Sequence, residues 1–308
     1  MLHFPVLLEE SVDFLVNDIN GQYVDCTFGR GGHSKLILKK ISSKGSLSSF
    51  DKDPEAYKYG LGFKNKNFNI YHDSFKNLGQ YFGNNSINGI IYDLGTCSTH
   101  FDNANRGFSF NKEGHLDMRF DNTSGIPFSE WLKNAEKKEI IEILYKYGDE
   151  KHARVIAEAI YEMQKIKPIL TTIQLASIIK NVYPEKKVKI NPATKSFQAF
   201  RIFINNELEE FKESLEISKR IIKKDGIIVI ISFHSLEDSI VKDFFKPTVK
   251  SFPKDIPVNN QEIKEFKCIA KKIRASSREL NENPRSRSAI MRVFKKIWLL
   301  WEWLLVFH

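Results

Sequence analysis

The stretch YVDCTFGRGGHS, Tyr23 to Ser34, runs from an apolar, strand-like segment into three glycines within four residues. Such a turn lets the backbone approach a ligand closely. A phosphate-binding Walker loop needs the spacing GxxxxGK[ST], which this stretch does not have. A dinucleotide loop needs GxGxxG, and here Gly29 and Gly31 are followed by Ser34 in the third position. The loop fits neither pattern in full, so a nucleotide-dependent dehydrogenase stays open only as a weakened alternative.

Strand-like and helical segments alternate around this loop. Short β-rich runs cover residues 22–26, 45–51, 67–73 and 88–95, and each carries Asp or another polar residue near its end. Helical runs lie between them, for example at residues 33–41 and 54–61. This order predicts an α/β fold with a parallel, doubly wound sheet, whose ligands bind outside the carboxyl ends of the strands.

The polar strand ends indicate what is bound there. Asp51 ends the second run, 20 residues after Gly31, where a carboxylate can accept hydrogen bonds from ribose hydroxyls. Dinucleotide sites and S-adenosylmethionine (SAM) sites share that feature. Asp73 ends the third run and Phe75 follows it, so that the two could bracket an adenine, and Asp93 lies near the end of the fourth. Together these positions favour an adenosine bound without a phosphate grip over a mere strand-to-helix turn with capping acids.

The alternation stops in the middle of the chain. Helical periodicity over residues 128–148, 152–166 and 171–183 predicts an inserted helical domain. Residues 197–224 then resemble one long amphipathic helix, and residues 225–238 return to a strand followed by polar residues. Segments 267–272 and 288–296 are expected to close the sheet as an antiparallel pair. The predicted organisation is a first sheet part at 1–104, a helical insertion at 105–195, a second sheet part at 196–296 and an apolar tail at 297–308.

Composition narrows the class of partner. The formal charge of +9 and the pI near 9.2 favour a polyanion, and basic residues collect at 271–280 and 283–296, although a solvated basic surface explains them equally well. Cys26, Cys97 and Cys268 are odd in number and widely spaced, which predicts neither a disulfide framework nor a metal site. The N-terminal residues lack a signal-peptide pattern, so neither export nor cleavable targeting is expected.

The tryptophan-rich tail, IWLLWEWLLVFH, is too short to span a bilayer, which needs roughly 20 residues. We expect it to dock on the protein's own surface, with an interfacial anchor or a partner contact as alternatives. No stable membrane association is expected.

Several longer motifs resemble one family over about residues 3 to 296. The chain is similar to the RsmH (MraW) family of bacterial SAM-dependent methyltransferases, which act on N4 of a cytidine in small-subunit ribosomal RNA. The motifs that carry the resemblance are HFPVLLEES, DCTFGRGGHS, FDKDPEA, DLGTCSTHFDNANRGFSFNKEGHLDMRF, NPATKSFQAFRIFINNEL, ISFHSLED and NPRSRSA.

The resemblance implies a class I SAM-dependent methyltransferase (Rossmann-like) sheet with an inserted all-helical domain for substrate recognition. It implies a cytoplasmic enzyme that methylates a cytidine in the decoding centre of 16S rRNA, with small-subunit rRNA or the ribosomal subunit as its partner. By the same resemblance, SAM contacts fall on Gly31, Gly32, His33, Asp51, Phe75, Asp93 and His100. His100 stands where the family has glutamine, and Thr99 replaces a usual proline. A non-catalytic RNA-binding or ribosome-assembly factor that retains the fold is the alternative this altered loop leaves open.

The N4 nitrogen is a weak nucleophile, so the reaction needs alignment and a proton acceptor. Candidate acceptors are Asp93, Asp102, Asp117 and His234, each of which could instead have a structural role. Carbon-5 methylation would need a cysteine nucleophile, and Cys97 is a weak alternative of that kind.

Unstacked RNA bases bind to aromatic planes flanked by cations. Phe108, Phe110 and Phe120 are interleaved with Arg106 and Arg119, although core packing explains at least one of the three rings. Further candidate phosphate contacts are Arg201, Arg274, Arg278, Arg285 and Arg287.

Overall fold

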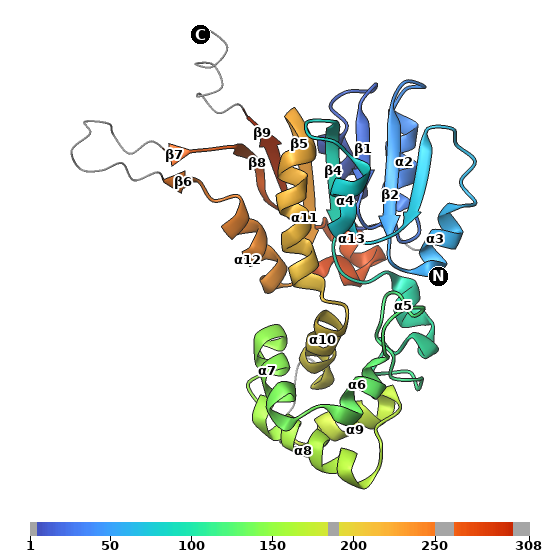
Figure 1. The fold of residues 1–308 in the computed structure, drawn as a ribbon, viewed down its shortest axis with the longest axis vertical. Coiled ribbons are helices and arrows are strands. Elements are labelled where there is room, and N and C mark those ends of the chain that lie inside the picture. Colours follow the sequence, from blue (N-terminus) through green and yellow to red (C-terminus); the bar gives the residue numbers. More distant parts are fainter. Residues whose placement is uncertain (1–4, 184–190, 250–261, 298–308) are drawn as a thin grey trace, which may run out of the picture. The chain divides into compact units, whose positions relative to one another are not determined.

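The computed structural model describes residues 5–183, 191–249 and 262–297 (Figure 1). The chain forms two compact units. The first combines the N-terminal part up to Gly95 with the part from Glu210 onward, and the second runs from Thr96 to Glu209. The second unit is thus inserted in sequence between two parts of the first, and it takes in residues 96–104 and 196–209 in addition to the 105–195 segment. The apolar tail at 298–308 lies outside the described residues.

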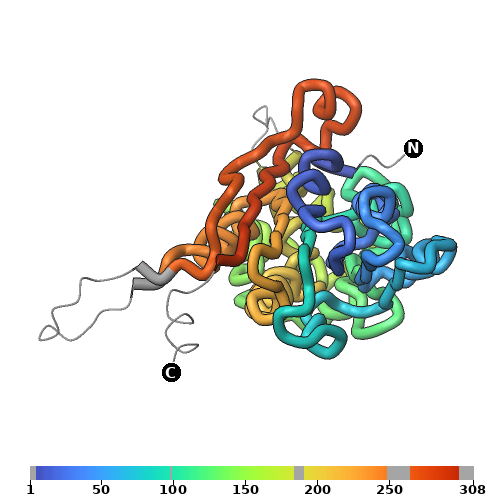
Figure 2. Tube along the Cα trace, turned by 90° about the horizontal axis from the view of Figure 1, so that it is seen from above, coloured from blue at the N-terminus to red at the C-terminus, as the bar shows by residue number. Residues whose placement is uncertain are grey.

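The first unit is built on a seven-stranded sheet with the strand order β3-β2-β1-β4-β5-β9-β8. Strands β1 to β5 are parallel, whereas β9 pairs antiparallel with both β5 and β8. Figure 2 shows β8 and β9, in orange and red, running side by side. The predicted doubly wound α/β sheet with an antiparallel closing pair is therefore confirmed. The strands are β1 Gln22–Asp25, β2 Ser46–Asp51, β3 Phe68–His72, β4 Ile87–Asp93, β5 Ile222–Ser232, β8 Phe266–Ile273 and β9 Ile290–Lys296.

Helices cover both faces of this sheet because its central strands are apolar on both sides. In β5, Ile227 and Val229 pack with Leu15 of α1, while Ile228 and Ile230 pack with Phe211 of α11. Burying each such side chain contributes about 1.5–3 kcal/mol. Figure 1 shows α4 and α11 on the near face. The helices of this unit are α1 Leu8–Leu15, α2 Gly32–Lys40, α3 Pro54–Gly60, α4 Leu78–Tyr81, α11 Glu207–Ile221, α12 Ser235–Phe244 and α13 Ser277–Glu282. Short elements are the 3₁₀ turns η1 Phe75–Asn77 and η3 Pro284–Ser288 and the strand pair β6 Thr248–Val249 and β7 Glu262–Ile263.

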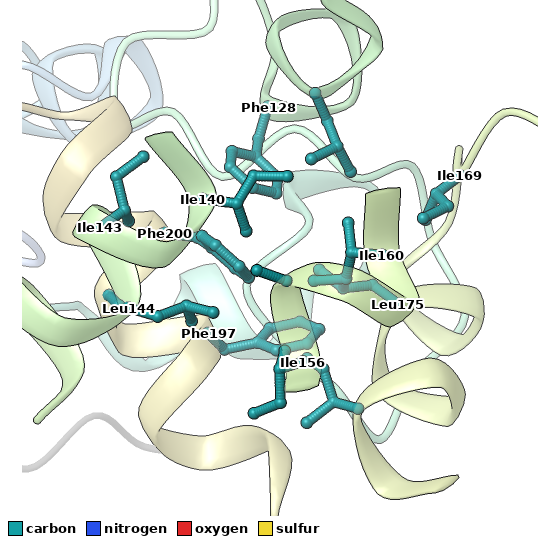
Figure 3. Packing of buried hydrophobic residues seen from close by; sticks show 14 of the residues in the cluster. Phe128, Ile140, Ile143, Leu144, Ile156, Ile160, Ile169, Leu175, Phe197 and Phe200 are labelled. Atoms are coloured by element: carbon teal, nitrogen blue, oxygen red, sulfur yellow. The ribbon is translucent and has the colours of Figure 1, made fainter. Parts of the chain in front are cut away.

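The second unit has its own helical core. Figure 3 shows apolar side chains from α7, α8, α9 and α10 converging, with Phe200 and Phe128 at a ring distance of 4.6 Å. Over residues 96–183 and 191–209 the structure contains no strand, only an isolated bridge between His115 and Thr171. The inserted part is therefore all-helical over these residues, as predicted. Its elements are α5 Ser98–Asp102, η2 Ala104–Arg106, α6 Phe128–Asn134, α7 Lys137–Gly148, α8 Ala153–Ile166, α9 Thr172–Asn181 and α10 Ala193–Ile204.

The prediction of one long helix over residues 197–224 is wrong. Helix α10 ends at Ile204, α11 begins at Glu207, and the last residues of the stretch belong to β5. The break lies at Asn205 and Asn206, where Asn206 has a left-handed φ of 52°. The side chain of Asn205 accepts from Phe120 N at 2.6 Å and donates to Met118 O at 2.7 Å. These tertiary bonds end α10 where periodicity alone would continue it.

The described residues contain neither a membrane-spanning helix nor a metal-binding cluster. None of their helices combines the length and the apolar character needed to cross a membrane. Among the same residues, no three His, Cys, Asp or Glu side chains come together as a possible metal site.

Candidate functional site

The glycine loop lies between β1 and α2 and has a backbone that only glycine adopts readily. Gly29 and Gly31 have φ values of 54° and 68°, a region that costs other residues roughly 1–2 kcal/mol. A Cβ on Gly31 would lie 2.5 Å from Phe63 Cζ, and one on Gly32 would lie 2.0 Å from Pro5 Cγ. The loop is therefore closely packed on its protein side: conformation favours glycine at positions 29 and 31, and space favours it at positions 31 and 32.

Asp25, at the end of β1, holds this loop through hydrogen bonds. Its carboxylate accepts from Thr27 N at 3.1 Å and from Ser34 Oγ at 2.6 Å, and Ser34 Oγ lies 2.9 Å from Ser49 Oγ. Burial raises the pKa of Asp25 to about 6, against the lowering effect of these hydrogen bonds. Sequence reasoning did not select Asp25 as a site residue. Its position at the end of β1, parallel to those of Asp51 and Asp93, was the available signal.

Asp51 lies at the carboxyl end of β2 and joins that strand to the loop. One carboxylate oxygen accepts from Gly29 N at 2.7 Å and the other from Asp53 N at 2.8 Å. A carboxylate has about four acceptor positions, so these bonds are compatible with ribose hydroxyls as further donors. The predicted ribose acid thus lies beside the glycine loop.

His33 and Asp93 face each other within the first unit. His33 Nε2 lies 3.1 Å from Val6 O, and because a carbonyl only accepts, this nitrogen carries a proton. In the neutral ring, Nδ1 is then an acceptor, and it lies 3.8 Å from Asp93 Oδ2. Asp93 N donates to Thr27 Oγ1 at 2.8 Å, which fixes the end of β4 against the glycine loop. Two acceptors at this distance suit a ligand that donates hydrogen bonds or carries positive charge.

Phe75 begins η1 just after β3, and its ring contacts Tyr92 edge-on at 5.7 Å. Asp73, which sequence reasoning grouped with Phe75 around an adenine, is engaged within its own loop. It accepts from Ser74 N at 2.7 Å and from Tyr81 OH at 2.8 Å. The bond to Asp73 raises the pKa of Tyr81 to about 12. Asp73 therefore shapes the segment that presents Phe75.

Carboxylates dominate this edge of the sheet. Four neighbouring strands end in or beside an aspartate: Asp73, Asp51, Asp25 and Asp93. Two nearby cations already have acidic partners, since Arg30 Nη2 lies 3.6 Å from Glu55 and Lys52 contacts Glu210. A phosphate here would be repelled, whereas ribose hydroxyls and a positively charged sulfonium or amino group would be favoured. The residues present therefore fit SAM.

The second unit holds His100 inside an aromatic stack. The His100 ring is 6% exposed and stacks on Phe108 at 4.9 Å, with Phe120 at 5.3 Å. Arg106 is 3% exposed and donates to the carbonyls of Arg119 and Phe120 at 3.1 and 2.7 Å. Arg106 thus uses its guanidinium to hold the loop and does not present it on the surface of this unit.

The four candidate proton acceptors are divided between the units. Asp93 and His234 belong to the first unit, where β4 and β5 are neighbours and Asp93 pairs in register with Ile231. His234 caps α12, and its Nε2 lies 3.0 Å from Oε1 of the buried Glu237.

The other two acceptors belong to the second unit. Asp117 forms a bidentate pair with Arg119 at 2.7 and 2.8 Å, and Asp102 is exposed, 3.8 Å from Lys112 Nζ. Asp117 thus already has a strong cationic partner.

The remaining RNA-binding candidates also fall into two groups. Arg201 forms a bidentate pair with Glu207 at 2.8 and 2.9 Å, and Phe110 packs edge-on against Phe197 at 5.6 Å in the helical core. A second group is exposed and lies between the end of β8 and the start of β9: Arg274, Arg278, Arg285 and Arg287. Within it, Arg278 Nε donates to Glu282 at 3.2 Å across the exposed face of α13.

A family model and two sequence relatives point to the same protein family. Residues 1–297 match the MraW methylase family. The chain is 44% identical over 304 residues to "Ribosomal RNA small subunit methyltransferase H" of Marinomonas sp., covering 96% of this chain and 97% of that protein. It is 46% identical to the protein of the same name from Caldicellulosiruptor bescii, covering 96% and 99%. A solved rRNA methylase from Streptococcus thermophilus is 13% identical with a TM-score of 0.43, covering 97% and 99%. On the match over residues 1–297 and the two relatives at 44% and 46% identity, the chain belongs to the MraW methylase family.

Proposed function

We propose that this protein transfers a methyl group from SAM to N4 of a cytidine in the decoding centre of 16S rRNA. The observation that carries the proposal is the row of carboxylates at the strand ends around a tightly packed glycine loop, Gly29 to Gly32. This site suits an adenosine with a positively charged substituent. The family and the names of its members, which are ribosomal RNA methyltransferases, support rRNA as the substrate. The proposal locates the protein with ribosomal subunits in the cytoplasm.

Each strand end has a role in holding SAM. Gly31 and Gly32 would offer backbone to its amino-acid half, and His33 Nδ1 with Asp93 would accept from its amino group. Asp51 would accept from the ribose hydroxyls, and Phe75 would contact the adenine. His100, at the position of the family's glutamine, stays a proposed contact from the second unit.

The chain's own residues would align the N4 amino group of the cytosine and take up the proton that it releases. SAM supplies the methyl group on a positively charged sulfur, which leaves as a neutral thioether. Asp93 would orient the cytosine amino group by accepting a hydrogen bond from one of its N–H groups. His234 is the acceptor that the geometry favours for the released proton, because a protonated ring would lie 3.0 Å from the Glu237 carboxylate. A carboxylate at this distance would stabilise the protonated form of the ring.

We propose that the exposed arginines of the first unit, Arg274, Arg278, Arg285 and Arg287, contact RNA phosphates. Arg106, Arg119 and Arg201 would instead support the protein parts that shape the RNA site, since each is buried or half-buried and is engaged by carbonyls or carboxylates. Phe108 and Phe110 would act with them, since both pack within the second unit.

Two experiments test the function. Calorimetry of the purified protein is expected to show SAM binding and no competition by NAD, and no binding at millimolar SAM would refute the enzyme and favour the assembly factor. Nucleoside analysis of 16S rRNA from cells lacking the gene is expected to show loss of N4-methylcytidine, restored by the wild-type gene. An unchanged profile would contradict the substrate.

A further inference from the structure

One buried carboxylate of α11 accepts hydrogen bonds from three side chains. Glu210, in α11, is 5% exposed. Its carboxylate accepts from Lys52 Nζ at 3.0 and 3.1 Å, from Lys76 Nζ at 3.2 Å and from Ser74 Oγ at 2.8 Å. Charge-assisted bonds of this kind are about twice as strong as neutral ones. Glu210 is thus the shared acceptor of a cluster that sequence reasoning did not find.

The partners of Glu210 lie next to the residues proposed for the adenosine half of SAM. Lys52 directly follows Asp51, the ribose acid, and Ser74 and Lys76 directly flank Phe75, the adenine contact. These residues are between 134 and 158 positions from Glu210 in the sequence. Strands β2 and β3 are neighbours, so one carboxylate fastens the two loops that leave them.

We infer that Glu210 is a positioning residue that holds the ribose-binding and adenine-binding loops in their ligand-ready arrangement. The inference rests on the proposed function and adds a residue outside the ligand-contacting set. Without the negative charge of the carboxylate, the two lysine ammonium groups would repel each other and lose their charge-assisted bonds. The loops would then adopt the competent arrangement less often. The apparent Kd rises in inverse proportion to the fraction of molecules in that arrangement.

The test is Glu210→Gln, which keeps the size and removes the charge. If the competent arrangement drops to about one tenth, the Kd rises about tenfold. S-adenosylhomocysteine and 5′-methylthioadenosine share the adenosine, and only the first has the amino-acid half. Calorimetry should therefore show the same loss for both ligands, with kcat at saturating SAM unchanged. Glu213→Gln, at an exposed position of the same helix, is the matched control and should bind like wild type.

A second variant covers the case in which Glu210→Gln does not fold. Lys76→Met removes a partner that is 39% exposed, and we expect a smaller loss, about threefold, again equal for both ligands. Unchanged Kd values in a folded variant would overturn the inference, as would a loss confined to S-adenosylhomocysteine or to kcat. Absence of binding by the wild-type protein would refute the proposed function instead.

Discussion

The variant Asp25→Asn removes the buried negative charge beside the glycine loop and keeps the hydrogen bonds around it. The asparagine can keep both local bonds, because its oxygen can accept from Thr27 N and its NH₂ can donate to Ser34 Oγ. Ser34 can then donate to Ser49. What the change removes is a buried carboxylate whose pKa is raised from 3.8 to about 6 by burial.

The raised pKa of Asp25 gives a signed prediction for the free energy of unfolding. The folded state holds the proton more tightly than the unfolded state, so this group's contribution falls as pH rises from 3.8 through about 6. At 1.36 kcal/mol per pKa unit, the full loss is about 3 kcal/mol. Between pH 5 and pH 8 the loss is about 1.4 kcal/mol. The variant does not have this loss, so its stability relative to wild type should rise by that amount over the same range.

Urea unfolding followed by circular dichroism at pH 5, 6, 7 and 8 measures this difference. Asp243→Asn, at an exposed position of α12, controls for the general loss of a carboxylate and should give a difference that is nearly flat with pH. A flat or falling difference for Asp25→Asn would refute the reasoning, because a buried ionised Asp25 would then carry no cost.

The other predictions concern the site. Gly31→Ala places a methyl group 2.5 Å from Phe63 at a φ of 68°, so SAM binding should weaken at least about tenfold, while Gly83→Ala, with open space around it, should leave it unchanged. Asp93→Asn removes the carboxylate that is proposed to orient the cytosine amino group and should lower kcat about 100-fold, measured in single-turnover methylation. Cys97→Ser should keep activity within about twofold, whereas abolished turnover would revive the alternative of covalent carbon-5 chemistry. Arg285→Ala should raise the KM for rRNA and reduce the salt dependence of binding by about one ion, with SAM affinity as the unchanged control.

The sheet and its strand ends were predictable from the sequence because they depend on local patterns. Short β-rich runs that alternate with helices require a parallel sheet, and the carboxyl ends of its strands then lie on one edge. Asp51 and Asp93 could therefore be assigned to the same edge without coordinates. The closing antiparallel pair was predictable because only two β-rich segments remained.

Features that depend on tertiary contacts were not predictable. The break at Asn205 is set by bonds to Met118 and Phe120, which are distant in sequence. The burial of Arg106 could not be predicted, because arginine side chains are ordinarily exposed and its carbonyl partners are set by the folded loop. Glu210 was missed for the same reason, since its role exists only once α11 packs on the sheet and brings the carboxylate to Lys52, Ser74 and Lys76.

The most direct test of the account is methyl transfer to a defined nucleoside. Purified protein is incubated with methyl-labelled SAM and with small subunits, or free 16S rRNA, from cells lacking the gene. The RNA is then digested and its nucleosides are identified by mass spectrometry. We predict label in N4-methylcytidine at a single position of the decoding centre. Label in 5-methylcytidine, or no label in either substrate, would contradict the proposed reaction.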